Sequence, residues 1–123
     1  MTGPERELRR RIFEAFARTG APPPLDAADR PALEALSERH VVVLDEAGAL
    51  LMAHPFAAHR EGASVAAGDR TWWGNCAWDA FGIAAALGLR DPRVEDHGLV
   101  AGPGVVFEVA VPAARWWDDI VHT

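Results

Sequence analysis

The sequence contains no lysine, a single cysteine and no long apolar run. One cysteine cannot form a disulfide within the chain, so a disulfide-stapled fold is excluded and a reducing compartment is favoured. A membrane-spanning helix needs roughly 20 apolar residues, and the charged N-terminus is not typical of a signal peptide. We therefore expect a cytoplasmic protein that does not enter a membrane.

Positive charge is also scarce. Twelve arginines stand against 18 acidic residues, which gives a net charge of −6. Binding to phosphates requires local positive charge, so this balance argues against a nucleic-acid or anionic-membrane partner. Half of the 123 residues are apolar, which is enough to bury the core of one ordinary domain.

The first half of the chain predicts two helices and a hairpin. Residues 4–19 have an apolar stripe at helical spacing, and Gly20 ends the pattern. A second helix is predicted over residues 29–39, with Leu33 and Leu36 facing inward. Two apolar runs, 40–44 and 49–53, flank a turn and predict a hairpin. The stripe of the first helix consists of Leu8, Ile12, Phe13 and Phe16.

Helix, helix and hairpin in this order suggest a reduced winged-helix module over residues 1–55. Its functional interpretation would be DNA binding. However, residues 1–55 carry seven arginines and nine acids, and no predicted recognition helix is basic. We therefore interpret this part as a structural module that packs on residues 56–123.

The second half predicts a small sheet around one helix. Strands are expected over residues 64–66, 70–73, 93–97 and 105–111, and a short helical segment over residues 113–120. Between them, residues 75–87 predict a helix with Asn75 as N-cap and Gly88 as the residue after its C-cap. The fold class is α+β, with a small antiparallel sheet packed against a central Cys-bearing helix.

That central helix carries the chain's most reactive pair of groups. Cys76 and Asp79 are three residues apart, so their side chains share a face of the predicted helix. The positive end of the helix dipole favours a thiolate in the first turn, whereas a nearby carboxylate opposes it unless that carboxyl is protonated. The alternative is a small buried cysteine beside a solvated acid.

From Phe56 through Trp117 the chain resembles the organomercurial (alkylmercury) lyase family. The resemblance is carried by residues 68–83, by residues 93–97 and by residues 116–119, whose sequences are GDRTWWGNCAWDAFGI, RVEDH and WWDD. It covers the second half well and the first half only in outline. The family also has a winged-helix-like N-terminal part, in agreement with the structural interpretation of residues 1–55.

The resemblance implies protonolysis of a carbon–mercury bond. Cys76 would attack as the thiolate and Asp79 would supply the proton, and both would hold the mercury transiently. Trp73, Trp78 and Phe81 would line the site for the organic group, or simply pack in the core, and their apolar surroundings would raise the pKa of the Asp79 carboxyl. No cofactor is expected; the partner is a small organomercurial or another soft electrophile.

The chain departs from the family in having no second cysteine. It ends at Thr123, about where that residue would follow. Three explanations are open: a divergent member, a fragment, or a UGA codon read as selenocysteine but recorded as a stop. A free low-molecular-weight thiol would then serve as the second sulfur. A shortened sheet would also expose an edge, which favours a homodimer.

Two alternatives belong to other classes of protein. The histidines and Cys76 would suffice for a non-catalytic zinc or copper site, although no pair has zinc-finger spacing. A mercury sensor that uses the winged-helix part is the other alternative, and the charge argues against it. The five histidines are His40, His54, His59, His97 and His122.

Overall fold

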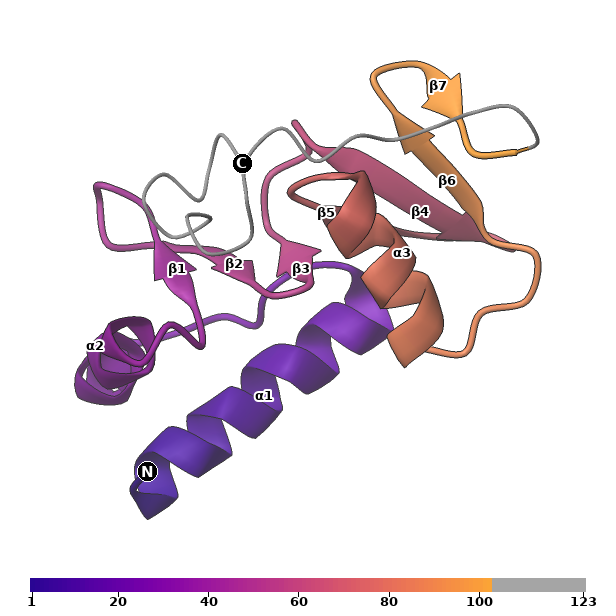
Figure 1. Ribbon diagram of the computed structural model, residues 1–123. Coiled ribbons are helices and arrows are strands. Elements are labelled where there is room, and N and C mark those ends of the chain that lie inside the picture. The colour runs from indigo at the N-terminus through magenta and orange to yellow at the C-terminus, as the bar shows by residue number, and fades with distance from the viewer. Residues whose placement is uncertain (103–123) are drawn as a thin grey trace.

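The first helix, α1 (Gly3–Thr19), runs along the bottom of the molecule in the computed structural model, which describes residues 1–102 (Figure 1). Thr2 and Glu5 form a capping box, with each side chain accepting the backbone N–H of the other at 3.3 Å. Gly20 ends the helix in the left-handed conformation. The predicted helix and its stripe are confirmed, since Leu8, Ile12 and Phe16 are buried.

A short 3₁₀ turn (Ala27–Asp29) leads into α2 (Arg30–Glu38), in which Leu33 and Leu36 are buried as predicted. The hairpin follows as β1 (Val43–Leu44) and β2 (Leu50–Ala53), and β2 also pairs with β3 (Phe56–Ala57). This antiparallel sheet has the order β1-β2-β3. It therefore spans position 55/56, where the sequence analysis divided the chain.

The second sheet is also antiparallel and has the order β5-β4-β6-β7. Its strands are β4 (Ala63–Ala67), β5 (Arg70–Gly74), β6 (Arg93–Asp96) and β7 (Leu99–Val100). Helix α3 (Ala77–Ala86) connects β5 to β6 and packs on β4, β5 and β6 (Figure 1). The α+β class and the three predicted strands within residues 1–102 are confirmed. A helix packs on the second sheet as expected, but it does not bear the cysteine, because Cys76 precedes its first residue.

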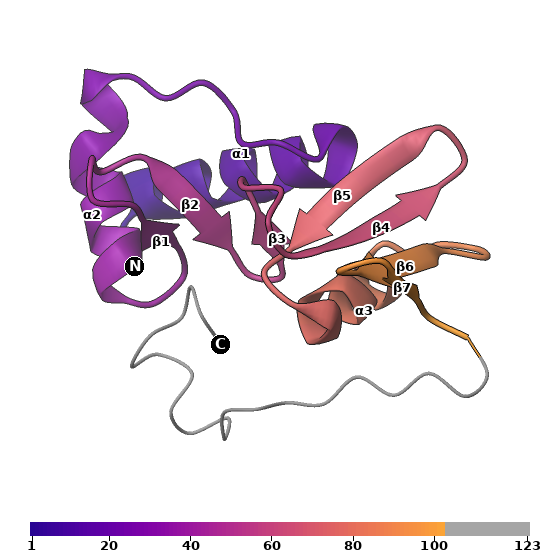
Figure 2. The same ribbon diagram turned by 90° about the horizontal axis from the view of Figure 1, so that it is seen from above.

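The C-terminal end of α1 joins the first half of the chain to the second sheet. Phe16 stacks on Phe56 of β3 with ring centroids 5.4 Å apart. The buried Trp72 indole on β5 donates a hydrogen bond to the Ala17 carbonyl at 3.0 Å. A Cβ at Gly20 would lie 2.5 Å from the Thr71 carbonyl oxygen. The two halves therefore share one hydrophobic core. The arrangement of α1 and the two sheets, with α1 in contact with β5, can be followed in Figure 2.

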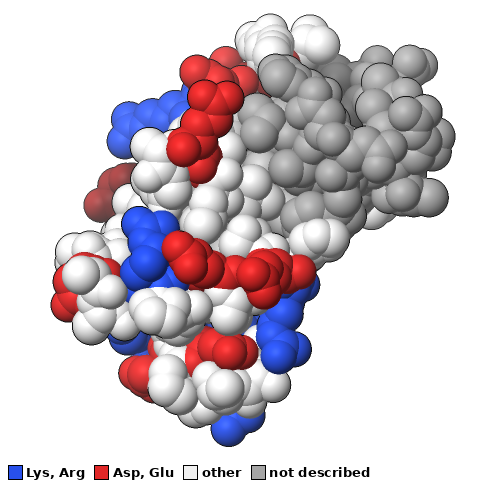
Figure 3. Space-filling view, turned by 90° about the vertical axis from the view of Figure 1, so that its left-hand side faces the viewer, with Lys and Arg blue, Asp and Glu red and all other residues white. Residues whose placement is uncertain are grey.

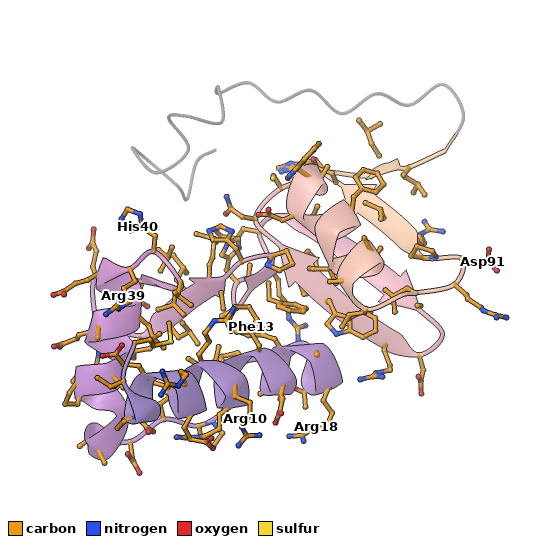
Figure 4. The ribbon with its side chains drawn as sticks, turned by 60° about the horizontal axis from the view of Figure 1, so that its bottom comes forward. Arg10, Phe13, Arg18, Arg39, His40 and Asp91 are labelled. Carbon is orange, nitrogen blue, oxygen red and sulfur yellow. The ribbon has the colours of Figure 1, made fainter. Side chains whose placement is uncertain are left out.

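The two faces of α1 differ in character, as Figure 4 shows. Phe13 points toward the rest of the fold and meets Phe56 edge-on at 6.4 Å, whereas Arg10 and Arg18 point away. On the outer face, Arg10 pairs with Glu7 and with Glu14, the latter at 2.8 Å. This division follows from the apolar stripe in the sequence.

The predicted strand 105–111, the helical segment 113–120 and Trp116 and Trp117 lie outside the described residues. Within residues 1–102, no helix combines the length and the apolar character needed to cross a membrane.

Candidate functional site

Cys76 is the N-cap residue of α3, immediately before the first helical residue, Ala77. Its backbone is extended, with φ −149° and ψ 174°. The prediction that the helix begins at Asn75 is therefore wrong by two residues. The Asn75 carboxamide oxygen lies 3.1 Å from His59 Nε2, while His59 Nδ1 accepts the Glu61 N–H. The Asn75 side chain thus fixes the approach to the helix instead of capping it.

Asp79 is the third helical residue of α3, so Cys76 and Asp79 occupy the N-cap and N3 positions. These are the two positions whose side chains each accept the backbone N–H of the other residue in a capping box. A thiol stands here where serine or threonine usually stands, and it makes no regular capping hydrogen bond. The expected grouping of thiol and carboxyl at one helix end is present.

The far end of α3 follows the sequence prediction. Gly88 adopts φ +59°, and Gly88 N–H and Leu89 N–H donate to the carbonyls of Ala85 and Ala84. This is the Schellman arrangement, for which glycine is the usual residue. The length and direction of the helix, and hence the place of Cys76, are fixed at both ends.

Burial raises the pKa of the half-buried Cys76 thiol above its ordinary value, the largest of several effects on this group. The backbone N–H groups of Asp79 and Trp78 act in the opposite direction, because N–H groups at a helix N-terminus stabilise a thiolate. The carboxylates of Asp79 and Asp96 disfavour a second negative charge and raise the pKa further. The resting sulfur is therefore a thiol at neutral pH.

The surroundings of Asp79 differ from the aromatic enclosure that the sequence suggested. Its side chain is 15% exposed, and its Oδ2 lies 3.7 Å from Nδ1 of His54, which is 27% exposed. Beneath it lies Gly74 of β5, where a Cβ would be 2.9 Å from the Asp79 Cβ. His54 lies 25 positions from Asp79 in the sequence, so no local pattern could have identified it.

The three aromatic residues predicted to line the site are placed differently from one another. Trp73 is partly buried, whereas Trp78 is 62% exposed and Phe81 is 43% exposed. Trp78 and Phe81 are three residues apart on α3 and so share a surface beside the N-terminus of the helix. Of the three tryptophans within residues 1–102, Trp72 is the fully buried one and belongs to the core. The role of Trp73, Trp78 and Phe81 toward a substrate stays a prediction.

The histidines within residues 1–102 do not converge. No group of three or more His, Cys, Asp or Glu side chains in this part of the chain is placed to hold a metal ion. His97 follows β6, with its Nε2 3.6 Å from Asp96 Oδ1. His122 lies outside the described residues.

A groove of about 670 Å³ lies elsewhere, between residues 22–27, which precede α2, and the turn between β1 and β2. Its lining residues include Leu33 and Leu50, and Cys76 is not among them.

On the face seen in Figure 3, acidic and basic side chains of the described residues are interspersed. That face therefore offers no uniformly positive surface for nucleic acid.

The sequence matches no family model, and neither the curated proteins nor the solved structures include a match to it.

Proposed function

We propose that this chain is an organomercurial-lyase-like protein that cleaves carbon–mercury bonds by protonolysis. The observation that carries the proposal is the placement of Cys76 and Asp79 at the N-cap and N3 positions of α3. Thiolate sulfur binds soft metals more strongly than nitrogen or oxygen ligands do. A carboxyl at N3, one turn of the helix from that sulfur, is suited to accept the thiol proton and to pass it on.

The reaction has two steps. In the first, the Cys76 sulfur bonds to mercury, an anion leaves the metal, and the thiol proton passes to the Asp79 carboxylate. In the second, that proton moves from Asp79 to the carbon while the carbon–mercury bond breaks. The products are the hydrocarbon and mercury(II) on the Cys76 sulfur, and Asp79 is again a carboxylate. Because burial raises the pKa of the resting thiol, the protein itself supplies the proton that reaches the carbon.

A free low-molecular-weight thiol completes the cycle. As its thiolate it bonds to mercury beside Cys76, and a second such thiolate then displaces the Cys76 sulfur. The Cys76 thiolate takes up a proton from water and is again a thiol. This offsets one of the two protons that the free thiols gave up on ionising, and the other balances the anion that left the metal. Capture of a thiol from solution is slower than reaction with a tethered one, because the effective concentration is lower. The exposed rings of Trp78 and Phe81 beside the N-terminus of α3 would contact an aromatic organic group.

The same proposal includes a winged-helix-like N-terminal part and a location in the cytoplasm. Residues 1–55 form a winged-helix-like part that supports the site through α1 and through β2, which pairs with β3, and not a DNA-binding module. A reducing cytoplasm suits a reaction that depends on one free cysteine and on soluble thiols.

The test is benzene release from phenylmercury with excess small thiol. The wild-type chain should exceed the rate with thiol alone, and Cys76→Ser and Asp79→Asn should return to that background. Asp69→Asn, an exposed acid in the β4–β5 turn, is the matched control and should keep the wild-type rate. Mercury bound at Cys76 without benzene would instead indicate the alternative, a non-catalytic mercury-binding protein. Wild-type release no faster than thiol alone would refute the lyase proposal.

A further inference from the structure

Asp79 lies between two groups from different parts of the chain. Cys76 precedes it by three positions as the N-cap of the same helix, and Asp79 Oδ2 lies 3.7 Å from Nδ1 of His54 in the β2–β3 connection. Both partners of this second contact are largely buried, with 27% of the His54 side chain and 15% of the Asp79 side chain exposed. Such burial reduces the screening by solvent that weakens surface ion pairs.

The contact between His54 and Asp79 is set by the backbone as well as by the side chains. Gly74 brings α3 close to β5, since a Cβ there would also lie 2.9 Å from the Ala80 nitrogen. On the other side, a Cβ at Gly82 would meet Pro55, the residue after His54, at 3.5 Å. Helix α3 therefore touches β5 and the β2–β3 connection at glycine positions on either side of Asp79.

Two carboxylates raise the pKa of the Cys76 thiol, and each has a histidine near it. Asp79 has His54, and Asp96 of β6 has the more exposed His97 at 3.6 Å. His59 reaches this region through Asn75. An imidazole N–H or imidazolium beside Asp79 Oδ2 draws the negative charge of the carboxylate away from the sulfur. The His54 contact therefore affects how easily the neighbouring thiol loses its proton.

We infer that His54 is a positioning residue of this site, which holds the Asp79 carboxyl beside Cys76 and compensates its charge. The inference rests on the proposed function, because it assigns His54 to the same transfer of a proton from thiol to carboxyl. His54 acts through Asp79 and not on the substrate. It assists the first step by stabilising the position that receives the proton, and it assists the second by keeping that proton close to the mercury-bound carbon.

The test is a double-mutant cycle on the reactivity of Cys76. Because Cys76 is the only cysteine, alkylation by iodoacetamide at one neutral pH reports on this thiol alone and needs no lyase activity. We compare the alkylation rate of the wild type with the rates of three single variants, His54→Ala, His54→Gln and Asp79→Asn. The cycle is completed by the double variant that combines His54→Ala and Asp79→Asn. His40→Asn, at an exposed position with φ +59° that asparagine tolerates, is the control for loss of a histidine. Thermal unfolding verifies that each variant is folded.

His54→Ala should slow alkylation by about threefold or more, as expected for residues in contact. In the Asp79→Asn background the same substitution should change the rate by less than about 1.5-fold, because the coupling partner is gone. His54→Gln, whose amide can donate to Asp79, should restore most of the rate, and His40→Asn should leave it unchanged. In benzene release, His54→Ala should lower kcat more than it raises KM.

An equal effect of His54→Ala in both backgrounds, or no effect in either, would overturn the inference. A coupled effect on alkylation in a chain that releases no benzene would separate the two ideas. The contact would then stand as a device that tunes the thiol, and the lyase proposal would fall.

Discussion

Gly74 of β5 and Asp79 of α3 pack so closely that a Cβ at position 74 would lie 2.9 Å from the Asp79 Cβ. The same Cβ would lie 2.9 Å from the Ala80 nitrogen. Both neighbours belong to a helix that is fixed at its two ends, so neither can yield by a side-chain rotation. This contact places the candidate acid over the sheet, within reach of both Cys76 and His54.

Gly74→Ala should therefore move the first turn of α3 away from β5. We expect a loss of about 1–3 kcal/mol in the free energy of unfolding, the usual cost of overpacking, and a slower release of benzene. Urea unfolding and the phenylmercury assay measure the two effects.

Gly82→Ala is the matched control on the same helix. A Cβ at Gly82 makes only ordinary contact with Pro55 at 3.5 Å, and alanine is favoured over glycine inside a helix by about 1 kcal/mol. This variant should be as stable as the wild type or more stable. Equal destabilisation by both substitutions would contradict the role of Gly74.

The thiol of Cys76 should titrate at high pH. Burial and the nearby carboxylates raise its pKa above the ordinary value of 9.0, so the rate of alkylation should still be rising at that pH. Asp79→Asn should move the midpoint downward, because one of the negative charges that oppose the thiolate is removed. A midpoint at or below 9.0 in the wild type would show that the N–H groups of the helix outweigh burial.

The ion pair between Arg11 of α1 and Asp29 before α2 should give an acid-dependent stability. Arg11 holds the pKa of the Asp29 carboxyl below its ordinary value of 3.8 through a contact of 2.9 Å. A lowered folded-state pKa stabilises the protein above the unfolded pKa, and this contribution is lost as the pH falls through the folded value. Arg11→Gln should thus lower stability near neutral pH, and the deficit should shrink below about pH 4.

Thermal unfolding of the wild type and Arg11→Gln over a range of acid pH tests this sign. Arg11 is the residue to change, since Asp29 also forms the capping box with Asp26. A deficit that stays constant down to the lowest pH would attribute the effect to packing of the arginine stem and not to its charge.

Trp72→Phe should weaken the connection between α1 and the second sheet. The substitution removes the N–H that meets the Ala17 carbonyl at 3.0 Å and leaves a gap in a buried position. We expect a loss of about 0.5–1.5 kcal/mol in the free energy of unfolding, the cost of one hydrogen bond, because Arg70 Nη2 still donates to the same carbonyl at 3.2 Å. Unchanged stability in urea would mean that the Arg70 hydrogen bond compensates for the lost indole N–H.

Elements with a strong local pattern were predictable from the sequence. The stripe on α1, Gly20 after it and Gly88 after α3 each follow from periodicity or from a backbone conformation that glycine favours. The two-residue strands β3 and β7 were not predicted, because so short a run has no period and forms only when a partner strand is present.

The site was predictable only along the helix. Cys76 and Asp79 are three positions apart, so the sequence could predict both at one helix end, although Cys76 is the N-cap and not a residue of the helix. The start of α3 was misplaced because the Asn75 side chain is engaged by His59, a contact that no local rule reveals. His54 reaches Asp79 only through the packing of the β2–β3 connection on α3, which is a property of the tertiary fold.

The central claim, that Cys76 captures an organomercurial and Asp79 protonates its carbon, is tested most directly by intact-mass spectrometry. Wild-type protein and Asp79→Asn are exposed to one equivalent of phenylmercury without added thiol, and the adduct on Cys76 is followed in time. The wild type should first carry phenylmercury and then mercury alone, with benzene released, while Asp79→Asn should keep the phenyl group. A phenylmercury adduct that persists equally in both proteins would contradict the account.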